Sequence, residues 1–103
     1  MNVRWFSGAK VAMQQTARYI RVQYGEESSK KFLRDVFRTE KLLRDNPHLG
    51  PIEPLLADFP STYRSIVVNR LNKIVYRIVE DHIEIADFWD VRREPESLAK
   101  QVK

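Results

Sequence analysis

The fold is decided by residues 63–77, which read Tyr63-Arg64-Ser65-Ile66-Val67-Val68-Asn69-Arg70-Leu71-Asn72-Lys73-Ile74-Val75-Tyr76-Arg77. Branched and aromatic residues flank a short polar turn at 69–70, and this pattern is typical of a β-hairpin. The hairpin carries four positive charges and no negative one; the cations are Arg64, Arg70, Lys73 and Arg77. Such a surface favours a partner with phosphate or carboxylate groups. The alternative is that the four cations are simply solvated.

Two helices are predicted upstream of this hairpin. Apolar residues recur at helical spacing from Ala9 onward, and Gly25 supplies the left-handed conformation that ends many helices. Glu26 and Glu27 suit the start of a second helix, because negative charge is favourable at a helix N-terminus. That helix should stop before Pro47, since the residue preceding a proline is pushed out of helical geometry. The short connection predicts an antiparallel helical hairpin.

The predicted fold class is α+β, with both helices packed on one face of the sheet. An N-terminal strand at 2–6 precedes the helical hairpin, and a three-stranded antiparallel meander follows at 62–68, 71–80 and 83–89. Because successive side chains on a strand point to opposite faces, Tyr76 should face the helices. Lys73 and Arg77 should then point into an open cationic surface on the helix-free face. We expect a single domain over residues 1–103.

Composition narrows the class of protein. The chain has 18 Lys and Arg against 14 Asp and Glu, a net charge of +4 that suits nucleic acid or an acidic protein partner. It has no cysteine, and His48 and His82 do not form a metal-ligand pattern, so we expect no disulfide, no metal and no other cofactor. No apolar run approaches transmembrane length and no signal peptide is recognisable, so we expect a cytoplasmic protein.

Several short segments occur in a fixed order along the chain. They are Val3-x-Trp5 before a helix with Ala9, then Leu43-x-x-x-Pro47-x-x-Gly50, then Lys73-Ile74-Val75-Tyr76-Arg77-Ile78, then Ile83-Glu84-Ile85, and Arg92-Arg93. In this combination, over about residues 2–95, the chain resembles the RelE/ParE superfamily of toxins from bacterial type II toxin–antitoxin systems, which include plasmid stabilization modules. The resemblance implies a growth-inhibiting toxin, neutralised by a cognate antitoxin whose partly disordered segment wraps it and sets its oligomeric state.

The resembled family divides by target. ParE-like members inhibit DNA gyrase without being nucleases, whereas RelE-like members cut mRNA in the ribosomal A site. Ribonucleolytic cleavage needs a base, an acid and cations that offset charge on the phosphate. The resemblance implies that Arg64, Lys73, and Arg92 or Arg93 occupy about the positions in the chain where RelE-like toxins carry cations. Lys73 and Arg92 are therefore the catalytic candidates if the chain is RelE-like.

The C-terminal tyrosine or histidine of RelE-like toxins has no counterpart at 94–100, where Glu94 and Glu96 are the remaining candidate bases. We therefore favour the ParE-like interpretation with DNA gyrase as target, and keep the ribosome and its mRNA as the alternative. A third reading is a toxin fold that has lost toxicity and survives as a binding partner. The predicted target- or antitoxin-binding residues are Arg64, Lys73, Arg77, Trp89, Arg92 and Arg93.

Two candidate binding features, Trp89 and a cationic helix face, have structural alternatives. Trp89 can stack on a base or anchor a partner if it is exposed, but either Phe88 or Trp89 can instead close the core. A run of cations also follows one face of the second helix, at Lys30, Lys31, Arg34, Arg38, Lys41 and Arg44. That face can contact nucleic acid or a target enzyme, although a charged helix face is more often only solvated.

Overall fold

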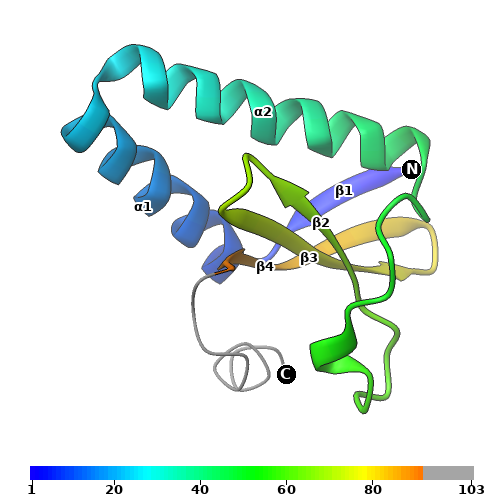
Figure 1. Cartoon of the computed structure of the whole chain (residues 1–103). Coiled ribbons are helices and arrows are strands. Elements are labelled where there is room, and N and C mark those ends of the chain that lie inside the picture. Colours follow the sequence, from blue (N-terminus) through cyan, green and yellow to red (C-terminus); the bar gives the residue numbers. More distant parts are fainter. Residues whose placement is uncertain (92–103) are drawn as a thin grey trace.

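The computed structural model describes residues 1–91, which form one mixed sheet with two helices on one face (Figure 1). The elements are β1 (Asn2–Trp5), α1 (Ser7–Tyr24), α2 (Glu26–Asp45), the short 3-10 helix η1 (Pro54–Leu56), β2 (Arg64–Val68), β3 (Asn72–Val79) and β4 (His82–Asp90). The strand order is β1-β4-β3-β2, with β1 parallel to β4 and the other pairs antiparallel. The predicted α+β fold and its order of elements are confirmed.

A single residue, Gly25, joins the two helices. Its φ of 98° lies in a region that glycine adopts without steric cost. Its N–H donates to the carbonyl of Arg21 at 3.0 Å and so closes α1. Near this turn the Ser29 hydroxyl donates to the carbonyl of Ala17 at 2.8 Å, which holds the helices in close contact. Neither helix of the described residues is long and apolar enough to span a membrane.

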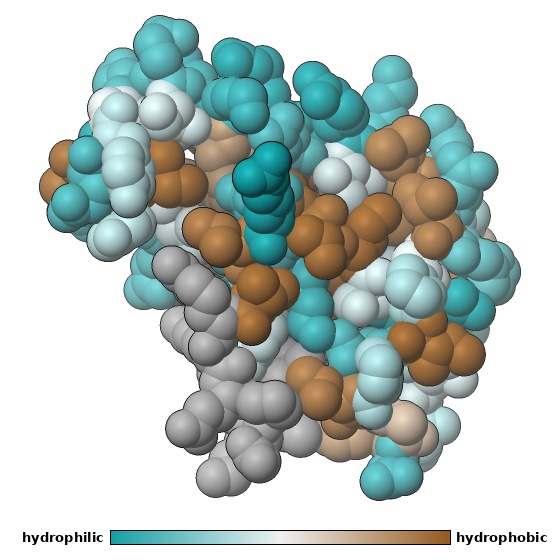
Figure 2. Space-filling model, in the orientation of Figure 1, coloured by the Kyte–Doolittle hydropathy of each residue, from teal (hydrophilic) through white to brown (hydrophobic). Residues whose placement is uncertain are grey.

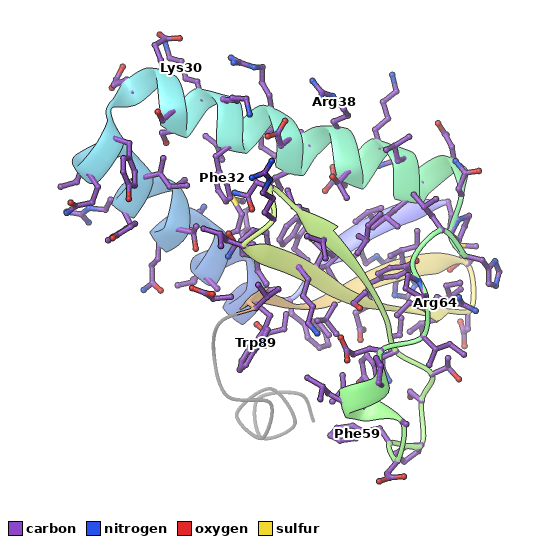
Figure 3. All side chains as sticks on the ribbon, viewed as in Figure 1. Lys30, Phe32, Arg38, Phe59, Arg64 and Trp89 are labelled. Atoms are coloured by element: carbon purple, nitrogen blue, oxygen red, sulfur yellow. The ribbon has the colours of Figure 1, made fainter. Side chains whose placement is uncertain are left out.

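The main core lies between the helices and the sheet. Its buried members are Ala9, Met13 and Ala17 of α1, Phe32, Val36 and Leu43 of α2, and Val68, Ile74, Tyr76, Ile83, Ile85 and Phe88 of the sheet. Phe32 meets the edge of Phe88 with ring centroids 5.8 Å apart, and Figure 3 labels its place beneath α2. The prediction that Tyr76 faces the helices is confirmed.

A β-bulge at Ala86 reverses the faces of the second half of β4. The register between β3 and β4 shifts there by one residue, so that Ala86 has no direct partner. As a result Ile85 before the bulge and Phe88 after it both face the helices. Trp89 consequently points to the helix-free face.

The helix-free face carries a second, smaller core. Residues 51–63, called the strap below, include η1 and lie next to the sheet on the side away from the helices (Figure 1). Leu56 and Tyr63 of the strap pack with Val75 and Trp89 of the sheet. Phe59 adds an edge-to-face contact with Tyr63 at 6.0 Å between ring centroids. This part of the sheet is therefore covered rather than open.

Candidate binding surfaces

Lys73 points to the helix-free face, as its place in the strand predicts, but it does not lie open. Its ammonium group donates a hydrogen bond to Oε1 of Glu53 in the strap and forms an ion pair with it. The Lys73 side chain is 14% exposed, and that of Glu53 is 2% exposed. The prediction of an open cationic surface is wrong at Lys73, because the strap brings a carboxylate onto this face.

Glu53 is the key residue that sequence reasoning missed. Burial by itself raises the pKa of Glu53. Its carboxylate accepts hydrogen bonds from Lys73, from the Leu55 N–H at 2.8 Å and from Ser65, and it lies beside the positive charge of Lys73. Together these interactions outweigh burial and lower the pKa of Glu53 below its ordinary value. Glu53 is thus ionised at neutral pH and neutralises Lys73. The available signal was one acidic residue in the apolar run from Pro51 to Leu56.

Arg77 is neutralised within the sheet. Its Nε donates to Oε1 of Glu84 at 2.6 Å, and the register places these residues directly opposite each other on β3 and β4. A second nitrogen donates to the Ser61 hydroxyl at 2.8 Å, and the guanidinium lies 5.8 Å from the centre of the Tyr63 ring. The hydrogen bond to Glu84 raises the pKa of Arg77 despite its partial burial. The expected open cation is wrong here too.

Arg64 leaves the sheet on the side opposite to Lys73. The register pairs Arg64 with Tyr76, which faces the helices. Its guanidinium donates to the carbonyl of Gly50 at 2.9 Å, at the end of the sheet where Figure 3 labels it. The sequence had suggested that the cations of the hairpin share one surface. In the structure they do not, because Arg64 and Lys73 lie on opposite faces of the sheet.

The Leu43-x-x-x-Pro47-x-x-Gly50 motif anchors a loop. The hydroxyl of Tyr76 donates to the Pro47 carbonyl at 2.8 Å and accepts the Gly50 N–H at 2.9 Å. Burial raises the pKa of Tyr76, which keeps this hydroxyl protonated. A Cβ on Gly50 would lie 2.6 Å from the carbonyl oxygen of Ser65, so the backbones approach too closely for any side chain.

Trp89 is not an exposed stacking residue. It is 1% exposed in the second core, and its neighbour Phe88 is 4% exposed in the main core. Of the two alternatives, the exposed, stacking Trp89 is wrong. Both rings close a core, because the helices cover the face of Phe88 and the strap covers the face of Trp89. Arg92, Arg93 and the segment 94–100 lie outside the described residues.

The remaining surface of the hairpin is mixed in character. Figure 2 shows hydrophobic side chains at the surface around the β2–β3 hairpin, among polar ones. Val67 is 59% exposed and Leu71 is 44% exposed, close in sequence to the exposed Arg70. This surface is therefore partly apolar rather than purely cationic.

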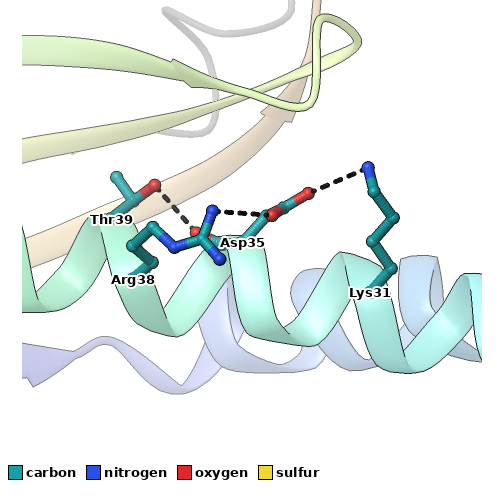
Figure 4. A network of polar contacts seen from close by, with 4 residues as sticks. All are labelled: Lys31, Asp35, Arg38 and Thr39. Carbon is teal, nitrogen blue, oxygen red and sulfur yellow. Dashed lines mark hydrogen bonds and ion pairs between the residues drawn. The ribbon is translucent and has the colours of Figure 1, made fainter.

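Two cations on the outer face of α2, Lys31 and Arg38, are paired with one carboxylate of the same helix. Asp35 lies 3.7 Å from the ammonium of Lys31 and 3.6 Å from the guanidinium of Arg38, and its backbone carbonyl accepts the Thr39 hydroxyl at 2.9 Å (Figure 4). The two cationic side chains are 74% and 70% exposed, so these pairs contribute little to stability. The geometry fits a solvated helix face.

A groove of about 610 Å³ lies between α1 and α2. Its lining includes residues from both helices and Trp5 of β1, whose indole N–H donates to Oε1 of Glu40 at 2.6 Å. Sequence reasoning did not predict this groove. The available signal was the helical spacing that places Lys10, Arg18 and Arg21 beside the apolar stripe of α1.

Comparison with solved structures supports the fold described above. No family model matches the sequence, and no curated protein matches it. Among solved structures, the chain is similar to one from "Chromosomal ParDE TA system from P. aeruginosa", with a TM-score of 0.73 and 20% sequence identity. The similarity covers 89% of this chain and 97% of that chain. The two chains share one fold. The fold implied by the sequence resemblance is therefore confirmed.

Proposed function

We propose that this chain is the toxin of a type II toxin–antitoxin module of the ParE kind. In this proposal it inhibits growth by binding a cytoplasmic protein target such as DNA gyrase, and a cognate antitoxin neutralises it. The observation that carries the proposal is the fold shared over 97% of a chain from a ParDE system. Of the predicted binding residues, Arg92 and Arg93 remain proposed contacts with the target or the antitoxin.

The electrostatics of the helix-free face favour binding over RNA cleavage. A ribonuclease needs cations that are available to the phosphate in the transition state. Lys73 is instead held by the buried carboxylate of Glu53, and Arg77 is held by Glu84. A phosphate approaching Lys73 would have to displace or face a negative charge. Tyr76 is no substitute acid, because its hydroxyl is buried between two backbone groups.

Induction in a bacterial host that lacks the antitoxin tests the proposal. We expect growth arrest, rescue by co-expression of the antitoxin encoded beside the toxin gene, and inhibition of supercoiling when the purified chain is added to DNA gyrase at micromolar concentration. Primer extension on translated mRNA should show no new 5′ ends. Normal growth would remove the toxin proposal and leave the reading of a non-toxic binding partner. New 5′ ends with fully active gyrase would establish the RelE-like alternative instead.

A further inference from the structure

A smaller pocket, of about 360 Å³, lies in the corner between α1 and the turn of the β2–β3 hairpin (Figure 1). This volume is within the range of small-molecule sites. Among the described residues, its lining has one carboxylate, from Asp90, and no lysine or arginine. Most of its polar side chains are uncharged, and they are Gln15, Thr16, Tyr19, Tyr24, Asn69 and Asn72. The pocket therefore suits an uncharged group that forms hydrogen bonds.

Asn72 is the most informative residue of this pocket. It is 6% exposed, and it faces α1, because its partner in the ladder, Val68, belongs to the main core. Within residues 1–91 its carboxamide forms no hydrogen bond. Buried polar side chains are normally paired, because an unpaired one costs free energy. A ligand that pairs with this carboxamide would recover that cost.

Two tyrosine rings stand beside this recessed amide. Tyr19 is 58% exposed and Tyr24 is 70% exposed, and both belong to the α1 side of the pocket. Exposed aromatic rings stack on planar ligands, and nucleobases are the common case. An asparagine amide pairs with the edge of a base through one donor and one acceptor. Ring faces next to an unpaired amide therefore favour a nucleobase.

The hairpin turn keeps an arginine in a conformation that favours glycine. Asn69 has a φ of 50° and Arg70 a φ of 75°, as in the tight two-residue turns whose second central residue is usually glycine. Asparagine tolerates this region well, whereas arginine is strained there. Arg70 is exposed, lies in the chain between Asn69 and Leu71 of the lining, and forms no ion pair within residues 1–91. Such retained strain points to a function, here a positive charge beside the pocket.

We propose that this pocket binds the adenine base of a nucleotide. The Asn72 carboxamide accepts a hydrogen bond from the N6 amine of adenine and donates one to N7. The rings of Tyr19 and Tyr24 stack on the base, and Arg70 contacts the phosphate. A glutamine side chain of a peptide can also pair with Asn72, but it offers no ring face to the tyrosines. The inference goes beyond the proposed function and does not depend on toxicity.

Isothermal titration calorimetry of the purified full chain with AMP tests the pocket. We expect one AMP per chain with a Kd below about 1 mM. IMP carries an oxygen in place of the N6 amine, so it presents two acceptors to Asn72 and should bind at least about tenfold more weakly. A short oligoadenylate distinguishes the two sources of the base. Affinity equal to that of AMP assigns a free nucleotide, and tighter binding that falls steeply with salt assigns a single strand.

Variants of the chain locate the binding. Asn72→Leu removes the carboxamide and should weaken AMP binding at least about tenfold. Its urea midpoint should stay equal or rise, because no internal hydrogen bond of the carboxamide is lost. Tyr19→Leu with Tyr24→Leu should weaken binding at least about fivefold. The matched control, Phe6→Leu with Phe37→Leu, removes two exposed rings outside the pocket and should stay within about twofold.

Arg70→Gly separates the phosphate contact from the base contact. It should weaken AMP binding at least about threefold and leave adenosine binding unchanged, because adenosine has no phosphate. It should not lower the urea midpoint, since glycine adopts the turn conformation without steric cost. Arg34→Ala removes an exposed cation of α2 outside the pocket and should leave AMP binding unchanged.

Several results would overturn the inference. They are the absence of saturable AMP binding, equal binding of IMP, and undiminished AMP binding by the folded Asn72→Leu variant. A lower urea midpoint of Asn72→Leu would show that the carboxamide supports the fold and not a ligand. A short glutamine-containing peptide that binds where AMP does not would make the pocket a peptide site. Circular dichroism confirms that each variant is folded.

Discussion

Replacing Lys73 by methionine tests the buried ion pair most sharply. Methionine keeps the length of the apolar stem but leaves the carboxylate of Glu53, 2% exposed, without its cation. Removing one partner of a buried pair typically costs 3–5 kcal/mol. Glu53 still accepts the Leu55 N–H at 2.8 Å, so we take the lower end, about 3 kcal/mol. For a chain of this size that loss lowers Tm by roughly 10–20 °C.

A double variant separates the lost charge pair from lost packing. Glu53→Gln with Lys73→Met removes both charges, and the glutamine oxygen can still accept the Leu55 N–H. We therefore expect it to recover most of the deficit and to unfold within about 1 kcal/mol of the original chain. Urea denaturation followed by tryptophan fluorescence measures all three proteins, because Trp89 lies beneath the strap.

The same pair predicts a pH dependence of definite sign. The pKa of Glu53 is lower in the folded chain than its ordinary value of 4.5. Its ionised form therefore contributes stability above that ordinary value, and this contribution is lost as the pH falls through the folded pKa. In Lys73→Met the carboxyl lacks its cation and burial raises its pKa, so the deficit should be largest at neutral pH and shrink on acidification. Equal stability of Lys73→Met and the original chain at neutral pH would refute this reasoning, as would a deficit unchanged by pH.

Three smaller predictions concern the loop anchor and the cross-strand pair. Gly50→Ala should lower the free energy of unfolding by about 2 kcal/mol, because its Cβ would lie 2.6 Å from a backbone oxygen of β2. The control is Gly8→Ala, whose Cβ meets nothing within 4 Å and which should not destabilise the chain. Tyr76→Phe should cost about 1–3 kcal/mol, since it leaves the buried Gly50 N–H without its acceptor. Unchanged urea midpoints would contradict both. Arg77→Met should lower the free energy of unfolding by about 1–2 kcal/mol, because it removes a partly buried hydrogen bond to Glu84. The folded variant should still arrest growth. Loss of growth arrest in the folded variant would mean that Arg77 contacts the target.

Most of the fold was predictable because its signals are local. Gly25 marks the turn between the helices, Pro47 follows the end of α2, and the alternation around Tyr76 gives the faces of β3. The place of β1 was not predictable in the same way. Its parallel pairing with β4 joins the two ends of the described chain, and no local pattern specifies such a contact.

The candidate site was less predictable, because it depends on contacts between distant residues. Period-two alternation placed Lys73 and Arg77 on the correct face, but it could not show that the strap returns over that face with Glu53. The bulge at Ala86 likewise changes which side of the sheet Trp89 occupies, and a one-residue irregularity leaves no clear trace in the hydrophobic pattern. Charge counting along the hairpin therefore overstated how much cationic surface is exposed.

We propose that the chain acts by binding protein and does not use Lys73 as a catalytic cation. The most direct measurement is growth after induction of the Glu53→Gln, Lys73→Met double variant, matched in expression to the original chain and shown to be folded. We expect both proteins to arrest growth to the same extent. Arrest by the original chain together with normal growth of cells making the folded double variant would contradict it.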